Sequence, residues 1–235
     1  MRRLLATMAL APVPRLLLTS SGLATPQIER VFASMLADAA RDTDAAPSVA
    51  YVATAAMAPN LSSESKRSPG ELRRRRWADA RRKAREIESG IGAPVECVDA
   101  ARDAEAAAAA IERCPCCWVT GGNTFYLWHH MRRAGLDAVV RERVGAGALY
   151  VGQSAGAIIA GADISTAHWK GWDDPRATLP DEDWSTAESV RGMGLAAPCF
   201  FPHYDPTYAE LVASRRDELG GNPLVLLDEA EAWTG

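Results

Sequence analysis

Short apolar runs alternate along the chain with longer amphipathic stretches. We predict strands from the apolar runs at residues 16–20, 48–53, 95–98, 117–120 and 149–151. We predict helices from the amphipathic stretches at residues 26–40, 69–88, 102–113, 124–134 and 136–144. Strands that alternate with helices indicate an α/β fold, here a three-layer sandwich with a mostly parallel sheet covered on both faces.

The domain is expected to begin at residue 15, after two prolines, and to run to residue 235 as one unit. Residues 1–14 hold arginines and small apolar residues but no acid, which is typical of a flexible extension or an organelle-targeting segment. Residues 162–197 are polar and rich in turn formers, and we predict a long functional loop there.

Composition narrows the class of protein. The net charge of −4 and the acids interspersed in the basic helix at 69–88 argue against a nucleic-acid partner. No apolar stretch approaches the ~20 residues of a membrane span. The five cysteines are an odd number and lack zinc-finger spacing, so we expect reduced thiols, no metal, and a cytoplasmic protein unless residues 1–14 direct it to an organelle.

The pentapeptide Gly-Gln-Ser-Ala-Gly at 152–156 lies between an expected strand and an expected helix. A G-x-S-x-G sequence in that setting forms a nucleophile elbow, because small neighbours leave room for a strained serine. Ser154 is therefore the candidate nucleophile. The backbone N–H of Ala155 is one candidate oxyanion donor, and Gly121 and Gly122, which follow another strand, offer a second.

A serine nucleophile needs a base, and four histidines are available. His129 and His130 fall within an expected helix and are predicted to face solvent. His203 follows an apolar, strand-like run and is the candidate that reaches the same edge of the sheet as the serine. His168 is the competing base.

The orienting acid is predicted from the order Ser…Asp…His. Asp173 and Asp174 lie in the long loop between the serine and the histidine. Asp163 lies nearer the elbow, and Asp205 is too close to His203 in the chain to orient it easily. The choice between Asp173 and Asp174 stays open.

Four segments together carry a family resemblance. Leu-Leu-Thr-Ser-Ser-Gly at 17–22, Gly-Gly-Asn-Thr at 121–124, the elbow and Pro-His-Tyr at 202–204 resemble the peptidase E (aspartyl dipeptidase) and cyanophycinase family of serine peptidases, in the same order. The resemblance runs from about residue 15 to the C-terminus. It implies a class I glutamine amidotransferase-like sandwich with serine in place of the amidotransferase cysteine.

The resemblance also implies roles for residues. It makes Ser154 the nucleophile and His203 the base, with Ala155 and a glycine of 121–122 in the oxyanion hole. Segment 166–175 looks like the family's Thr-Thr-Asn-Asp-Met-Pro stretch with an insertion, which selects Asp173 first and Asp174 second. Related chains continue through a final strand, so the C-terminus is expected to be truncated.

We therefore expect a serine exopeptidase without a cofactor that cleaves short peptides, above all dipeptides with an N-terminal aspartate. Asn123, Lys170 and Arg191 are the candidate substrate-binding residues. The alternatives are a cyanophycinase-like or ester-cleaving hydrolase and a non-catalytic binding member of the fold. The expected partner is a short peptide, not a nucleic acid or a membrane, and the protein is a possible homodimer.

Overall fold

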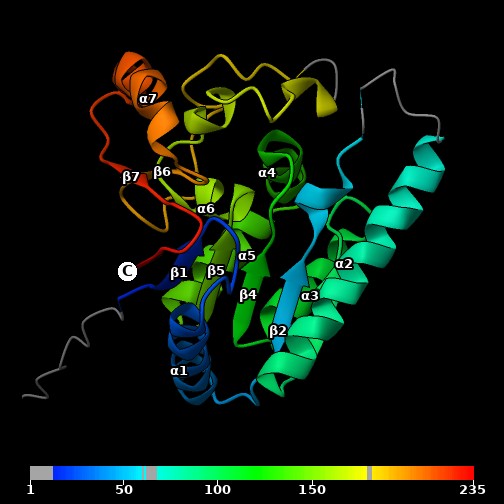
Figure 1. Ribbon diagram of the computed structural model, residues 1–235. Helices are drawn as coiled ribbons and strands as arrows, with labels where there is room; N and C mark the ends of the chain where they lie inside the picture. Colours follow the sequence, from blue (N-terminus) through cyan, green and yellow to red (C-terminus); the bar gives the residue numbers. More distant parts are fainter. Residues whose placement is uncertain (1–12, 60, 62–67, 179–181) are drawn as a thin grey trace, which may run out of the picture.

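A computed structural model describes residues 13–59, 61, 68–178 and 182–235. Its centre is a six-stranded sheet in the order β3-β2-β4-β5-β1-β8 (Figure 1). The strands are β1 (Arg15–Thr19), β2 (Val49–Val52), β3 (Val95–Val98), β4 (Cys116–Val119), β5 (Leu149–Gln153) and β8 (Ala232–Thr234). The first five are parallel, and β8 pairs antiparallel with β1.

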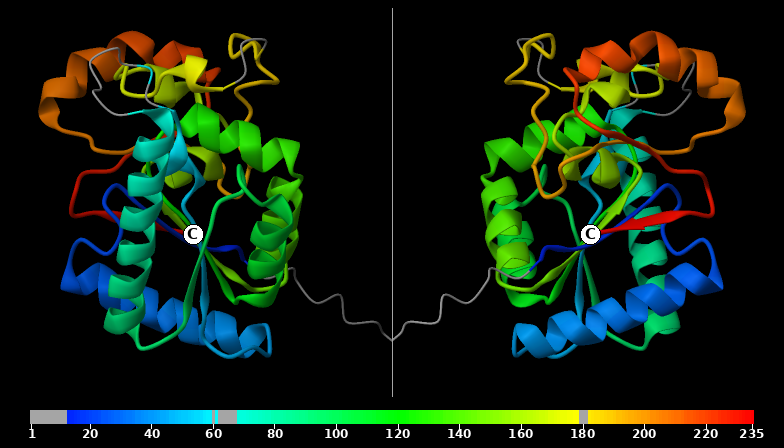
Figure 2. Two further views of the ribbon diagram at one scale, coloured as in Figure 1. Left: turned by 90° about the vertical axis from the view of Figure 1, so that its right-hand side faces the viewer. Right: turned by 90° about the vertical axis from the view of Figure 1, so that its left-hand side faces the viewer.

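Helices cover both faces of this sheet (Figure 2). They are α1 (Pro26–Asp42), α2 (Pro69–Ile91), α3 (Ala104–Arg113), α4 (Thr124–Arg133), α5 (Leu136–Gly145) and α6 (Ala155–Ala160). Buried apolar residues of α1 and α2 pack on one face, and those of α3 to α6, apart from Tyr126 of α4, pack on the other. The predicted three-layer sandwich with a mostly parallel sheet is confirmed. None of the described helices is both long and apolar enough to cross a membrane.

Register explains why the central strands β2 and β4 are apolar along their whole length. Trp118 of β4 lies opposite Tyr51 of β2 and Val151 of β5, and all three pack toward α1 and α2. Their neighbours Cys117 and Tyr150 pack toward α3 to α6. Successive side chains of a strand point to opposite faces, so a strand buried on both sides needs apolar residues at every position.

The helices begin where the sequence carries capping signals. Thr25 accepts a hydrogen bond from the N–H of Ile28, and Pro26 occupies the first turn of α1. Ser68 and Glu71 form a reciprocal capping box at the start of α2. These local contacts fix the two helices that cover one face of the sheet.

A second, two-stranded parallel sheet lies beside the carboxyl ends of the large one. It consists of β6 (Cys199–Phe201) and β7 (Leu224–Leu226), with α7 (Ala209–Arg215) in the connection between them. The buried Ser20, just after β1, donates to the carbonyl of Leu227 at 3.0 Å. This bond ties the ends of β1 and β7 together, and it brings the loops after β6 and β7 to the edge where β5 ends.

The long loop between α6 and β6 is anchored by tryptophans. Trp169 packs against Phe201, with ring centroids 5.6 Å apart, and Trp184 packs against Phe125 at 5.1 Å. Trp172 is 61% exposed. The loop is therefore held to the body at two points, and the partly exposed indole of Trp172 lies beside the rings of His203 and Tyr208.

Candidate active site

Ser154 lies at a strained turn between β5 and α6. Its backbone has φ 50° and ψ −108°, values that L residues rarely adopt, and its N–H donates to the carbonyl of Thr19 at 2.8 Å. A Cβ on Gly156 would lie 2.2 Å from the carbonyl oxygen of Val119, and one on Gly152 would lie 2.6 Å from that of Gly156. Glycine is therefore required at 156, where α6 packs against β4, and at 152, where β5 packs against α6.

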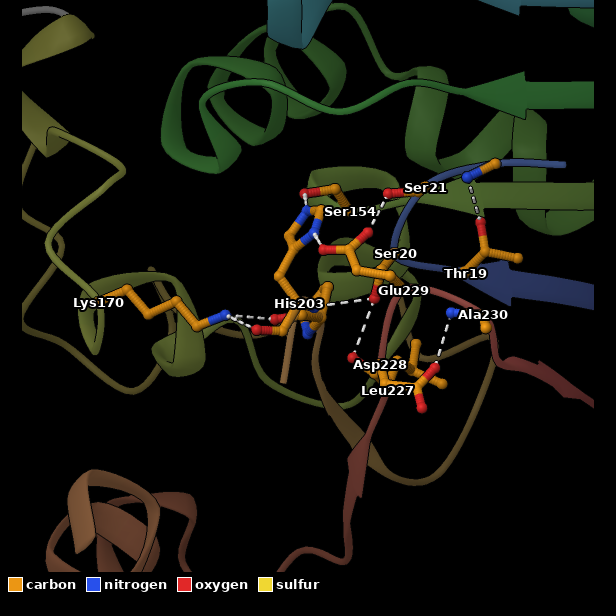
Figure 3. Close-up of polar contacts among 12 residues, drawn as sticks. Thr19, Ser20, Ser21, Ser154, Lys170, His203, Leu227, Asp228, Glu229 and Ala230 are labelled. Atoms are coloured by element: carbon orange, nitrogen blue, oxygen red, sulfur yellow. Dashed lines mark hydrogen bonds and ion pairs between the residues drawn. The ribbon is translucent and has the colours of Figure 1, made fainter. Parts of the chain in front are cut away.

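The imidazole of His203 faces this serine. Its Nε2 lies 3.0 Å from Ser154 Oγ (Figure 3). His203 follows β6 and also has a positive φ, 54°. Its N–H donates to the Oγ of Ser20 at 2.8 Å, so the end of β1 holds the backbone of the residue that reaches Ser154.

Glu229 is the carboxylate at the imidazole. Its Oε1 lies 2.5 Å from Nδ1 of His203, and its other oxygen accepts a hydrogen bond from the hydroxyl of Ser21 (Figure 3). The hydrogen bonds from Ser21 and then from His203 lower the pKa of Glu229. Serine, imidazole and carboxylate thus lie in one line of contacts.

This arrangement corrects the prediction that Asp173 or Asp174 contacts the histidine. Asp173 accepts the N–H of Thr124 at 3.1 Å, and burial raises its pKa. Asp174 is paired with Arg176 at 2.7 Å, which lowers its pKa. Glu229 takes the place because it follows β7, whose carboxyl end lies beside the end of β1, whereas the order of residues along the chain places no constraint on which acid arrives there.

The other histidines lie elsewhere. The ring of His168 packs against Phe125 at 4.4 Å, so the structure does not bring it to the serine. The prediction that His129 faces solvent is wrong, because His129 is buried and lies 2.6 Å from the carboxylate of Glu182. His130 is half-buried, and burial lowers its pKa to about 4.

The backbone around Ser154 supplies the candidate oxyanion donors. A Cβ on Gly121 would lie 3.0 Å from the Cβ of Ser154, so this strand end passes directly over the serine. Gly122 has φ 141°, and a Cβ there would lie 2.3 Å from the carbonyl of Ala55. Ala155 opens α6, so its N–H has no partner within the helix. The N–H groups of Ala155, Gly121 and Gly122 are therefore the candidate donors to a substrate oxygen at Ser154.

A cavity of about 350 Å³ opens beside Ser154. It is lined by Gly122, Asn123, Ser154, Ile158, Thr166, Ala167, Lys170, Trp172, Asp173, Phe201, Pro202 and His203. Its size is at the small end of the range of about 300–1,000 Å³ that ligand pockets cover. Within the part of the chain that the structure describes, no three His, Cys, Asp or Glu side chains gather to hold a metal ion.

The structure places the three candidate substrate-binding residues in different surroundings. The side-chain amide of Asn123 accepts the N–H of Tyr126 at 2.8 Å and donates to the carbonyl of Asp174 at 2.9 Å, so it fastens the loop to α4. Lys170 lines the cavity. Arg191 pairs with Glu188 at 3.0 Å on the surface and is not part of the cavity lining.

The site places a strained serine against an imidazole and the imidazole against a carboxylate, on a mostly parallel α/β sheet. This is the arrangement of a serine hydrolase. The comparison with known families agrees. The chain belongs to Peptidase family S51, whose profile matches residues 16–234.

Curated relatives match shorter segments. The uncharacterized peptidase Lin0382 of Listeria innocua is 35% identical over 88 residues, covering 37% of this chain and 38% of that protein. Peptidase E of Shewanella amazonensis is 42% identical over 87 residues, covering 37% and 32%. Peptidase E of Salmonella newport is 39% identical over 92 residues, covering 39% of each chain. The aligned segments span less than half the length of each relative.

Solved structures extend the likeness of the fold to nearly the whole chain. A Listeria monocytogenes protein assigned to peptidase E has a TM-score of 0.65 at 21% identity, over 95% of both chains. A peptidase from an acI-B1 actinobacterium has a TM-score of 0.67 at 18% identity, over 95% of this chain and 83% of that one. At these identities the likeness bears on the fold alone.

Proposed function

We propose that the protein is a serine peptidase that hydrolyses short peptides through an acyl-enzyme. The observation that carries the proposal is the line of contacts from Ser154 Oγ to His203 Nε2, 3.0 Å, and from His203 Nδ1 to Glu229, 2.5 Å. An ionised carboxylate at Nδ1 fixes the ring tautomer that leaves Nε2 free to accept a proton.

In the acylation step Ser154 Oγ attacks the carbonyl carbon of the peptide bond, and its proton passes to Nε2 of His203. The carbonyl electron pair moves onto the oxygen, which accepts hydrogen bonds from the N–H of Ala155 and of Gly121 or Gly122. The C–N bond then breaks, and the imidazolium gives its proton to the leaving amine.

Deacylation repeats the sequence with water. His203 takes a proton from a water molecule, whose oxygen attacks the ester carbonyl. The bond to Ser154 Oγ breaks, and the serine oxygen recovers the proton from the imidazolium. The peptide's amino-terminal part leaves as a free acid, and the enzyme returns to its starting state.

The cavity supports a short substrate with a free amino terminus. Asp173 lines it, and no Lys or Arg among the described residues contacts the Asp173 side chain. A substrate ammonium would offset the cost of holding that carboxylate in a buried position. Lys170 is the one Lys or Arg among the described lining residues. The buried Asp173 carboxylate and the peptidase E resemblance support dipeptides with a free amino terminus, above all those with an N-terminal aspartate, as the preferred substrates.

The test is to assay Asp-Leu, N-acetyl-Asp-Leu and Leu-Leu with the wild type and with Ser154→Ala. We expect wild-type cleavage of Asp-Leu, weak cleavage of the other two, and a loss of about 10³-fold or more in Ser154→Ala. Ser214→Ala, which removes an exposed hydroxyl from α7, is the matched control and should retain full activity.

The outcomes separate the alternatives. Full activity of Ser154→Ala would show that Ser154 is not the nucleophile. Cleavage of small esters or of a cyanophycin-like polymer, with none of the dipeptides, would keep the serine hydrolase and change its substrate. A folded wild type that a fluorophosphonate probe does not label at Ser154 would favour a non-catalytic binding protein.

A further inference from the structure

Lys170 points from the long loop toward the backbone that carries the catalytic histidine (Figure 3). Its Nζ donates to the carbonyl oxygen of Pro202 at 2.6 Å and to that of His203 at 2.7 Å. The sequence suggested a contact with substrate for this lysine. The structure instead commits two of its three N–H donors to the chain itself.

Aromatic rings enclose the same ammonium group. Nζ lies 4.3 Å from the ring centroid of Phe201 and 4.5 Å from those of Trp172 and Tyr208. A cation within about 6 Å of a ring is attracted to its face, and the attraction grows as water is excluded. The rings come from β6, from the loop and from the turn after His203, so the ammonium sits where three segments meet.

A cation such as the Lys170 ammonium stabilises the backbone at His203. Its positive φ of 54° is unfavourable for a side chain with a Cβ. The carbonyl dipoles on either side of this residue converge on one point, where their negative ends repel unless a cation lies between them. Ser20 already fixes the N–H of His203 from the other side. The lysine and the serine together clamp the peptide units that flank the imidazole.

We infer that Lys170 is a positioning residue, whose ammonium group holds the strained backbone of His203 so that the imidazole reaches Ser154. This inference rests on the proposed function, since it concerns the base of that reaction. It differs from a role in recognising acidic substrates, because a positioning residue affects every reaction of Ser154, including those with uncharged reagents.

The clamp depends on the charge of the lysine. Burial lowers the pKa of Lys170 to about 8, so it loses its proton as the pH rises through that value. A neutral amine donates weaker hydrogen bonds than an ammonium and has no cation–π attraction. The other titratable groups that face this position are Glu229 after β7, His203, the Tyr208 hydroxyl and Asp173 on the loop.

The test compares Lys170→Met, Lys170→Arg and the wild type. Met keeps an unbranched stem without donors or charge, and Arg keeps both. We measure the rate at which an uncharged fluorophosphonate probe labels Ser154, together with kcat and KM for Asp-Leu. We expect Lys170→Met to label about 100-fold more slowly, with the loss in kcat rather than KM, because small displacements of a catalytic group cost rates of that order. Lys170→Arg should recover at least ten-fold of this loss.

The pH dependence provides a second readout that does not require the Met variant to fold. The wild-type labelling rate should fall about five-fold as the pH rises through about 8, and Lys170→Arg, which stays charged, should show no such fall. Tyr208→Phe keeps the ring and removes the hydroxyl, so its labelling rate should still fall as the pH rises through about 8. Lys83→Met removes an exposed lysine from α2 and should label like the wild type.

Wild-type labelling rates for Lys170→Met, with only KM for Asp-Leu increased, would overturn the inference and make Lys170 a specificity residue. A wild-type rate that does not fall between pH 7 and 10 would also overturn it. Neither result contradicts the proposed peptidase function. That proposal fails only if labelling and cleavage do not depend on Ser154.

Discussion

Glu229 has a side chain that is 62% exposed, yet each of its oxygens has a partner in His203 or Ser21. We expect Glu229→Gln to lower kcat/KM for Asp-Leu by about 10³-fold or more, because an amide at Nδ1 no longer selects the tautomer that accepts the serine proton. Steady-state kinetics and fluorophosphonate labelling measure this loss.

Asp173→Asn is the matched comparison, because it changes the acid that the sequence favoured. It should raise KM for dipeptides with a free amino terminus and leave the labelling rate within about three-fold of the wild type. If Asp173→Asn abolished labelling while Glu229→Gln retained it, the acid would have to be assigned to Asp173 after all.

At this scale the sequence predicted two of the three residues in the line of contacts. Ser154 lies in a motif that needs glycines on both sides, and His203 lies at the end of an apolar run. Glu229 has no local motif, and its side chain is exposed. A signal was nevertheless present: Glu229 follows the apolar run at 224–227, and parallel strands end at the same edge.

At the scale of elements, the stability of the fold depends on the close contact of α6 with β4. A Cβ on Gly156 would collide with the carbonyl of Val119, so Gly156→Ala should destabilise the fold by about 3 kcal/mol and reduce labelling of the neighbouring serine. Urea unfolding measures the change.

Gly90→Ala provides the control. Gly90 lies in α2 with nothing within 4 Å of the added methyl group, so the change should stabilise the protein by about 0.5–1 kcal/mol. Equal effects of the two substitutions would show that helical propensity, and not the collision, governs Gly156.

The elements that the sequence predicted have strong periodicity or capping residues. The expected strand at 95–98 matches β3, and the expected helix at 26–40 matches α1 apart from its last two residues. β8 was not expected. It has three residues, too few to carry a pattern, and it exists because it pairs with β1 and places Trp233 against Phe200 at 5.3 Å.

At the scale of the whole molecule, the line of contacts from Ser154 to Glu229 spans two sheets. Ser154 comes from the large sheet, whereas His203 and Glu229 follow strands of the small one. Trp233 of β8 packs against Phe200 of β6 and so joins the two. Trp233→Ala should therefore destabilise the fold by about 2 kcal/mol and slow labelling of Ser154, while Trp233→Phe should retain most of both.

Thermal unfolding and labelling rates measured on the same samples test this link. A loss of stability in Trp233→Ala without any loss of labelling in the folded fraction would mean that the small sheet keeps its position by other contacts.

The positive φ of Ser154 has a practical consequence for trapping a bound peptide. At an ordinary position an alanine variant is more stable than a glycine variant by about 0.5–1 kcal/mol. Here the Cβ is what makes the backbone unfavourable, so Ser154→Gly should be the more stable of the two inactive forms, by about 1 kcal/mol in thermal unfolding. Ser154→Gly is therefore the better choice for crystallising the protein with an uncleaved dipeptide.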